Sequence, residues 1–138
     1  MNPLCREEGV GLIPYSPIGG GLLAGSRRTG TVRSRSPMAR DRFNRPADEA
    51  VIDAVRQVAE RRGVKPAEVA IAWLLSRPGV TAPIVGATKA GHLEDPIKAV
   101  QTALSAEEVS ILEGAYETQA PLPFYFRPPP QPAAAKAA

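Results

Sequence analysis

The segment GVGLIPYSPIGGGLLAG, residues 9–25, joins a short apolar run to a glycine-rich loop. The run is rich in β-forming residues at its centre and is closed by Pro14, which predicts a buried strand that ends at Tyr15. In the loop that follows, 16–25, the backbone can approach a ligand closely because glycine has no Cβ. The segment therefore predicts a strand with a candidate ligand-binding loop at its carboxyl end.

Two helices are predicted beyond a segment, 27–45, that is rich in Arg, Ser and Pro and shows no periodicity. Apolar residues between Val51 and Ala59 fall on one stripe, acidic residues stand in the first turn, and a glycine ends the helix. Pro66 then marks an early position of the next helix. We expect that helix to be buried on most sides, because 69–75 is nearly all apolar.

A second short apolar run, 81–85, predicts another strand, and the turn 86–89 after it leads into a helix. The apolar positions at helical spacing in this helix are Leu93, Ile97, Val100 and Leu104. Pro96 near its start is expected to kink it. The last helix begins with a capping box at 105–108. The residues that it is expected to bury are Val109, Leu112 and Tyr116.

The order strand, helix, helix, strand, helix, helix predicts an α/β protein with parallel strands, because helical crossovers join the short apolar runs. Two parallel strands alone would leave apolar edges without partners, so the pattern looks like a piece of something larger. Beyond Glu117 the sequence becomes a tail rich in Pro and Ala, which cannot build a core. We therefore divide the chain into a folded part, 1–117, and a tail, 118–138.

The composition is typical of a soluble globular protein, with 43% hydrophobic and 22% charged residues. The formal net charge of +3 suits an anionic ligand but is too small to indicate one by itself. Only one cysteine is present, Cys5, which excludes an intrachain disulfide and a cysteine-cluster metal site. The sequence shows no signal-peptide pattern and no apolar run long enough for a membrane helix. These features predict a cytoplasmic protein without a membrane partner.

Three segments in this order resemble the aldo/keto reductase family. Residues 9–25 are similar to the seventh-strand segment of the family, and 67–75 resemble the helix between its seventh and eighth strands. Residues 81–95 resemble the eighth strand and its cofactor-binding turn. The resemblance, from about Leu4 to Tyr116, implies the C-terminal part of a (β/α)8 TIM barrel, namely strands 7 and 8 with their helices. A complete barrel of this kind needs about 250 residues.

The resemblance also implies an activity, the reversible NADPH-dependent reduction of aldehydes or ketones to alcohols. Family members use an Asp, Tyr, Lys and His tetrad on earlier strands, and none of those positions lies in this sequence. Tyr15 matches the position that stacks on the cofactor, and His92 matches a residue near the adenosine end, so neither replaces a member of the tetrad. We therefore expect no catalytic residue here and no activity from this chain alone.

The role that the resemblance implies for this chain is contact with the cofactor, NADP(H). Tyr15 matches the aromatic residue that stacks on the nicotinamide ring, at the C-terminal end of a barrel strand, where barrel active sites lie. The residues that resemble the loop along the pyrophosphate are Ser16, Pro17, Ile18, Gly20 and Leu22. Two alternatives stay open, namely that Tyr15 is a packed core side chain and that the loop is an ordinary glycine-rich turn.

A second cofactor segment matches the turn that binds the adenosine 2′-phosphate in the family, where a helix start and a cation jointly favour a dianion. Its residues are Gly86, Ala87, Thr88 and Lys89. Lys89 is the expected phosphate ligand, with a solvated surface lysine as the alternative. His92 and Asp95 follow on one helix face and match residues that reach the 2′-phosphate or the adenine amine. An exposed helix residue is the alternative for His92, and Pro96 replaces an asparagine that contacts adenine in many members.

Three interpretations compete for the arginine-rich segment 27–45. It is a solvated loop, a flap that closes over the NADPH phosphates, or a contact for nucleic acid. The third interpretation is disfavoured, because Phe43 is the only aromatic residue in the segment and the rest of the chain offsets the charge.

A different class of function also stays open for the whole chain. A non-catalytic nucleotide-binding or protein-interaction module would capture a partner through the exposed edges of its strands. The expected partners are accordingly NADPH, the missing N-terminal half of the barrel, or a second copy of the chain through self-association. The identity of the carbonyl substrate has no signal in this sequence.

Overall fold

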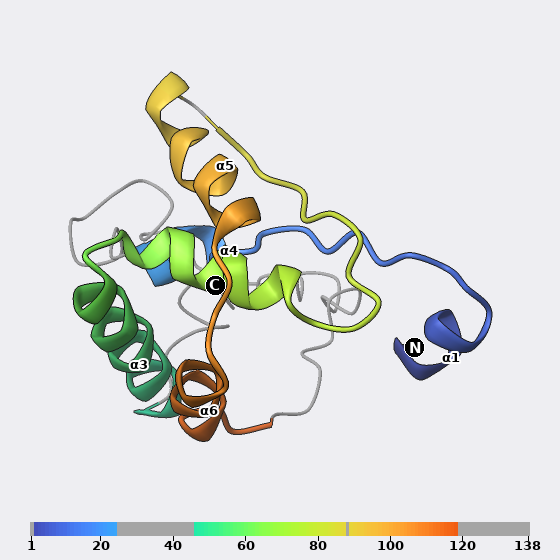
Figure 1. The fold of residues 1–138 in the computed structure, drawn as a ribbon, viewed down its shortest axis with the longest axis horizontal. Helices are drawn as coiled ribbons and strands as arrows, with labels where there is room; N and C mark the ends of the chain where they lie inside the picture. The colour runs from blue at the N-terminus through green and yellow to red at the C-terminus, as the bar shows by residue number, and fades with distance from the viewer. Residues whose placement is uncertain (1, 25–45, 88, 119–138) are drawn as a thin grey trace, which may run out of the picture.

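The computed structural model describes residues 2–24, 46–87 and 89–118, and Figure 1 shows its ribbon. The elements, in chain order, are α1 (Asn2–Glu7), η1 (Gly19–Ala24), α3 (Pro46–Arg62), α4 (Pro66–Leu75), η3 (Ala90–His92), α5 (Glu94–Gln101) and α6 (Ala106–Gly114). The predicted helices correspond to α3, α4, α5 and α6, whereas α1 was not predicted. The arginine-rich segment and nearly all of the tail lie outside the described residues. Nowhere in the described ranges is a helix long and apolar enough to span a membrane.

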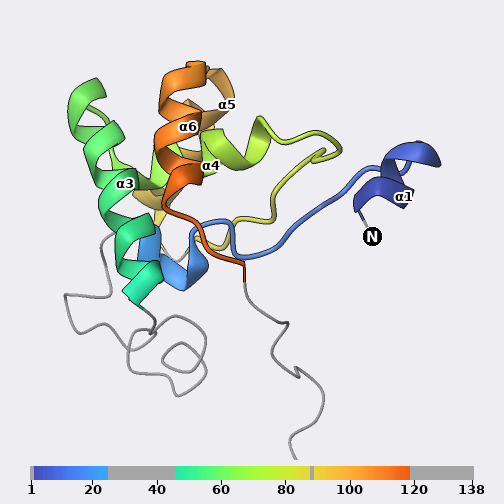
Figure 2. The same cartoon turned by 90° about the horizontal axis from the view of Figure 1, so that it is seen from below.

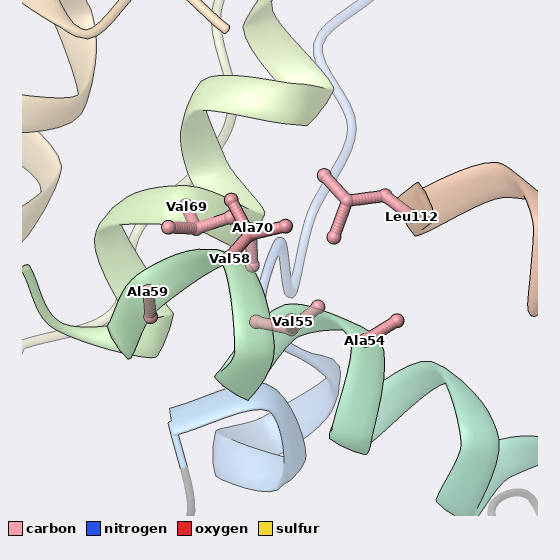
Figure 3. Close-up of a cluster of buried hydrophobic side chains, with 7 residues drawn as sticks. All are labelled: Ala54, Val55, Val58, Ala59, Val69, Ala70 and Leu112. Atoms are coloured by element: carbon pink, nitrogen blue, oxygen red, sulfur yellow. The ribbon is translucent and has the colours of Figure 1, made fainter. Parts of the chain in front are cut away.

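The main core lies where α3, α4 and α6 meet, and Figure 3 shows its side chains. They are Ala54, Val55, Val58 and Ala59 of α3, Val69 and Ala70 of α4, and Leu112 of α6. Val58 and Val69 have no exposed surface. Burying a side chain of this size contributes on the order of 1.5–3 kcal/mol. The apolar stripe of α3 and the burial of α4 are thus confirmed.

α5 packs on α4 through a second, smaller cluster. Ile71 and Ala72 of α4 meet Ala99 of α5. The other apolar positions predicted for this helix are exposed, namely Leu93 by 46%, Ile97 by 65% and Val100 by 72%. The helix was predicted correctly, but these residues do not join the core, because α5 turns the small Ala99 toward α4. Leu104 lies beyond the end of α5 and packs against both clusters.

Pro96 lies in the first turn of α5, because the helix begins at Glu94, and the missing N–H of proline is not needed there. One further detail of the sequence prediction is wrong. Tyr116 is not buried by α6, because the helix ends at Gly114 and the side chain of Tyr116 is 60% exposed. Leu112 of α6 is buried as predicted.

A hydrogen-bonded clamp joins the end of α3 to the start of α6. The predicted capping box is present, since Glu108 N donates to Ser105 Oγ at 3.2 Å and Ser105 N donates to Glu108 Oε2 at 2.7 Å. Arg62 donates to both carboxylate oxygens of Glu108, from Nε at 2.5 Å and from Nη2 at 2.6 Å. Arg62 Nη2 also donates to Ala103 O at 2.8 Å. One carboxylate therefore caps α6 and ties it to α3.

Acid is expected to weaken this clamp. The Arg62 guanidinium, together with the amide and hydroxyl of Ser105, lowers the pKa of Glu108 from 4.5 to about 2. Because the folded-state pKa lies below the unfolded one, the clamp stabilises the fold fully above about pH 4.5 and loses this contribution as the pH falls toward 2. We expect Glu108→Gln to lower the free energy of unfolding by about 1–2 kcal/mol at neutral pH, and by much less near pH 3. Urea unfolding at the two pH values measures the difference.

Glu107→Gln is the matched control for this experiment. Glu107 is adjacent in sequence, its side chain is 79% exposed, and its carboxylate lies 3.6 Å from Arg61. An exposed pair of this kind contributes little, so the control should change the free energy of unfolding by less than about 0.5 kcal/mol. Equal losses for the two variants would show that the clamp adds nothing beyond a general charge effect.

The two predicted strands meet as isolated parallel bridges. The bridges join Leu12 to Val80 and Tyr15 to Ile84. Their hydrogen bonds, each of 2.8 Å, run from Leu12 N to Gly79 O, from Thr81 N to Leu12 O and from Ile84 N to Pro14 O. The parallel direction agrees with the prediction, but neither segment forms a strand within the described ranges. Prolines at 14 and 83 lack the N–H that a longer ladder would use.

The paired segments reach out from the helical bundle. Both views of the ribbon show them running beside each other between the bundle and α1 (Figures 1 and 2). Apolar side chains on both segments are exposed, namely Val10 by 55%, Ile13 by 63% and Ile84 by 54%. More than half of each of these residues is therefore left uncovered by the described part of the chain. The fold of the described part is therefore a small helical core from which an uncovered parallel pair extends.

Candidate functional site

The paired segments bring both candidate ligand-binding loops to one end. Because the segments run parallel, the loop after Tyr15 and the turn after Ile84 leave from the same end of the pair. Tyr15 is 62% exposed, so the interpretation of Tyr15 as a packed core side chain is wrong. An exposed aromatic ring at the start of a loop is suited to stack on a planar ligand.

Backbone hydrogen bonds hold the glycine-rich loop in shape. Gly19 N donates to Ser16 O at 2.9 Å, and Gly21 N donates to Ile18 O at 3.1 Å. Gly20 and Gly21 have φ angles of 68° and 101°, which favour glycine. Ser16 adopts a φ of 55° although it has a side chain. A conformation of this kind costs on the order of 1 kcal/mol and is concentrated at functional sites, so it marks this loop.

The loop residues fall into two groups by burial. Ser16 and Gly20 are exposed and Pro17 is half-buried. Leu22 is 7% exposed, and Ile18 packs against both core clusters. The side chains of Ile18 and Leu22 therefore anchor the loop in the core, Leu22 as a buried residue and Ile18 as a partly buried one.

The turn after Ile84 carries an exposed lysine. Gly86, Ala87 and Lys89 are exposed, and Thr88 lies outside the described residues. The backbone of Lys89 is extended, with φ −140° and ψ 148°, and it leads directly into η3. Among the described carboxylates none forms an ion pair with Lys89. No carboxylate of the described ranges therefore has to be displaced before its ammonium group binds an anion.

His92 and Asp95 lie on two helical elements that follow each other directly. His92 is exposed at the end of η3, Asp95 lies in the first turn of α5, and Leu93 between them has helical φ and ψ angles of −90° and −18°. That the two side chains share one face stays a prediction. Asp95 Oδ1 lies 2.9 Å from Lys65 Nζ, and the Asp95 side chain is 15% exposed. The Asp95 carboxylate raises the pKa of Lys65 above its ordinary value. Sequence reasoning missed Lys65, because no motif surrounds it and its partner belongs to another helix.

A further polar cluster joins α4 to α6. Trp73 Nε1 donates to Glu113 Oε1 at 3.1 Å. The Arg77 guanidinium pairs with the same carboxylate and lies over the Trp73 ring, 5.2 Å from its centroid. Trp73 is the only tryptophan of the chain, so its fluorescence reports on this packing. In the part of the chain that the structure describes, no group of His, Cys, Asp and Glu residues is arranged to hold a metal ion.

Both candidate loops follow segments that meet in parallel bridges, and helices pack beside them. This is the arrangement at the carboxyl ends of neighbouring strands in α/β proteins. The chain belongs to the aldo/keto reductase family, whose family model matches residues 1–117. The resemblance seen in the sequence is thus confirmed. The fold of this family is a TIM barrel.

Individual relatives support the assignment. Versiconal hemiacetal acetate reductase of Aspergillus parasiticus is 37% identical over 126 residues, which cover 87% of this chain and 36% of the relative. Probable aldo-keto reductase 1 of Glycine max is 33% identical over 111 residues, 78% of this chain and 32% of the relative. A probable voltage-gated potassium channel subunit beta of Arabidopsis thaliana is 33% identical over 105 residues, 71% of this chain and 32% of the relative.

Solved structures agree with this assignment. A thermostable aldo-keto reductase in complex with the inhibitor epalrestat matches with a TM-score of 0.54 and 27% sequence identity. The match covers 83% of this chain and 32% of the solved chain. The chain thus spans about a third of the length of the relatives that it matches.

Proposed function

We propose that the chain forms strands 7 and 8, with their helices, of an NADPH-dependent aldo/keto reductase barrel and carries part of its cofactor site. Membership of the family supports an oxidoreductase function. The parallel bridges support the assignment of the two segments to neighbouring barrel strands. In this proposal 1–117 are the partial barrel domain and 118–138 its tail. The single cysteine, Cys5, is in keeping with a cytoplasmic location.

The observation that carries the proposal is the pairing of Tyr15 with Ile84. The glycine-rich loop and the turn that carries Lys89 start from this pair, so one extended dinucleotide is able to contact both. Tyr15 then stacks on the nicotinamide ring, the loop follows the pyrophosphate, and Lys89 binds the 2′-phosphate. The exposed aromatic face of Tyr15 suits the ring, and the exposed glycine backbone of the loop suits the pyrophosphate. The exposed cation of Lys89 suits the terminal phosphate.

The proposed cofactor-binding residues are Tyr15, Ser16, Pro17, Ile18, Gly20, Leu22, Gly86, Ala87, Thr88, Lys89, His92 and Asp95. Their proposed roles differ. Tyr15 and Lys89 act through exposed side chains, whereas Ile18 and Leu22 act as core anchors that shape the loop. Asp95 acts through its contact with Lys65.

We further propose that this 138-residue chain does not reduce carbonyl compounds by itself. The resemblance assigns proton transfer to an Asp, Tyr, Lys and His tetrad on earlier strands of the barrel. Tyr15 is assigned to the cofactor ring and His92 to the adenosine end, so the chain retains no residue assigned to proton transfer. In the complete barrel the reaction is reversible reduction of an aldehyde or ketone to an alcohol.

A second candidate function is supported by the uncovered apolar side chains of the paired segments. Val10, Ile13 and Ile84 are each more than half exposed. Such a surface favours a non-catalytic interaction module that binds the N-terminal half of a barrel or a second copy of the chain. This candidate does not require that NADPH binds.

Titration of the full chain with NADPH, followed by nicotinamide fluorescence, tests the proposed function. We expect saturable binding, and a dissociation constant about tenfold higher for Lys89→Ala, because a charge-assisted contact to phosphate contributes roughly 1.4 kcal/mol. Lys98→Ala is the matched control, since Lys98 is an exposed lysine in the last turn of α5. It should leave the dissociation constant within about twofold.

Three results would contradict parts of this proposal. Absence of saturable binding by a chain whose circular dichroism is helical would refute the cofactor site and favour the interaction module. Equal effects of Lys89→Ala and Lys98→Ala would place the phosphate elsewhere. Oxidation of NADPH on addition of an aldehyde would refute the claim that the chain alone is inactive.

A further inference from the structure

The first turn of α5 is held to the start of α4 by one ion pair. Lys65 Nζ lies 2.9 Å from Asp95 Oδ1. The Asp95 side chain is only 15% exposed, whereas that of Lys65 is 62% exposed. A carboxylate that has lost most of its water needs a nearby cation, because an unpaired buried charge is costly. Lys65 supplies the cation for Asp95.

Lys65 stands at a position where a lysine does not stabilise its own helix. It is the N-cap residue of α4, and its side chain caps none of the first amide groups. Ser, Thr, Asp or Asn is preferred at an N-cap, and a cation there opposes the partial positive charge of the helix start. The contact with Asp95 therefore accounts for the placement of Lys65 better than any role in α4 does.

Asp95 and Lys89 belong to one continuous hydrogen-bonded segment. His92 N donates to Lys89 O at 3.0 Å, and Leu93 N donates to Ala90 O at 3.0 Å. Ile97 N of α5 then donates to Leu93 O at 3.1 Å. Because each turn of the segment is bonded to the next, fixing Asp95 also restrains the turn that carries Lys89.

We propose that Lys65 is a positioning residue for the phosphate end of the cofactor site. It fixes Asp95, and with it segment 89–95, and it neutralises a carboxylate that would otherwise repel the 2′-phosphate. This inference rests on the proposed function, since it concerns the turn assigned to NADPH. The inference adds Lys65, at the start of a different helix, to the residues that determine the affinity of the turn for a phosphorylated dinucleotide.

The proposal predicts an effect on NADPH that NADH does not share, because NADH lacks the 2′-phosphate. Lys65→Ala leaves one more uncompensated negative charge beside the turn and loosens the segment. A unit charge at about 10 Å in a largely solvated site changes binding roughly two- to threefold. Loosening of segment 89–95 adds to this effect. We therefore expect Lys65→Ala to bind NADPH three- to tenfold more weakly and to change the affinity for NADH by less than twofold.

The experiment is titration of the full chain with NADPH and with NADH for a set of variants. Lys65→Arg retains the cation and should restore the NADPH affinity. Lys65→Ala combined with Asp95→Asn removes both charges and should recover at least half of the loss. Lys98→Ala, which removes a cation from α5 without touching the pair, should leave the ratio of the two affinities unchanged. If Lys65 had a purely structural role, Lys65→Ala would lower the affinities for NADPH and for NADH equally. That result would overturn the proposal.

A second measurement separates this inference from the proposed function. Amide hydrogen exchange of residues 92–95 is followed without any cofactor in the unmodified chain, Lys65→Ala and Lys65→Arg. We expect exchange to be several times faster in Lys65→Ala and normal in Lys65→Arg. If the unmodified chain binds no NADPH, the proposed function fails, but this exchange pattern would still support the positioning role. Unchanged exchange in Lys65→Ala would overturn it.

Discussion

Replacing Ile71 by alanine is expected to lower the free energy of unfolding by about 3–4 kcal/mol. Ile71 is 2% exposed and joins α4 to α5 together with Ala72 and Ala99. Truncation removes apolar contacts and leaves a cavity between α4 and α5. The loss is a large part of the roughly 5–15 kcal/mol that stabilise a typical domain. Urea unfolding followed by circular dichroism and by Trp73 fluorescence measures it.

Ile97→Ala is the matched control, because it makes the same chemical change on α5 at a side chain that is 65% exposed. We expect a change of less than about 0.5 kcal/mol. A loss comparable to that of Ile71→Ala would mean that the outer face of α5 is covered in solution. Repeating the measurement over a range of protein concentrations would then detect self-association as the cause.

Gly11→Val is expected to separate the two paired segments. A Cβ at Gly11 would overlap Thr81 Oγ1 and lie 3.1 Å from Thr81 Cβ. Rotation of the Thr81 side chain can relieve the first contact but not the second, so the backbone has to move, at a cost of about 2–3 kcal/mol. Because Thr81 N and Ile84 N donate across the pair, their amide exchange should become about 30-fold faster or more. NADPH affinity should fall in parallel.

The steric explanation can be tested by a second substitution. Thr81→Gly removes the Cβ that the introduced valine side chain would meet, so the double variant should regain slow exchange at Ile84. Gly86→Val is the control for adding a valine near the site, since a Cβ at Gly86 meets nothing within 4 Å. It should leave the exchange of Ile84 unchanged. Fast exchange in the double variant would contradict the steric argument.

Much of the helical core could be predicted because its signals are local. The stripe of α3, the proline at the start of α4 and the capping box at Ser105 each lie within one helix or at its end. The orientation of α5 could not be predicted in the same way. Its spacing indicates a helix, but whether Ala99 or Ile97 meets α4 depends on a partner far away in the sequence. α1 was missed because six residues without an apolar stripe give no periodic signal.

For the candidate site, a sequence motif can indicate backbone segments but not side chains that meet across elements. The glycine-rich loop and the turn before Lys89 follow from the family motifs. The pairing of Asp95 with Lys65 joins two helices, so no local spacing indicates it. The two apolar runs form two isolated bridges in the described part of the chain instead of full strands, because Pro14 and Pro83 lack the N–H that a longer ladder would use.

The anchoring of Ile18 and Leu22 in the core makes the proposed cofactor loop part of the folding unit. Binding and folding are then thermodynamically linked, since a ligand that holds only the folded loop stabilises the whole chain by mass action. At a ligand concentration about one hundred times the dissociation constant, this linkage contributes about 2.7 kcal/mol. A substitution at Leu22 would consequently change both the affinity and the melting temperature of the ligand-free chain, whereas one at the exposed Lys89 would change the affinity and leave the melting temperature of the ligand-free chain unaltered.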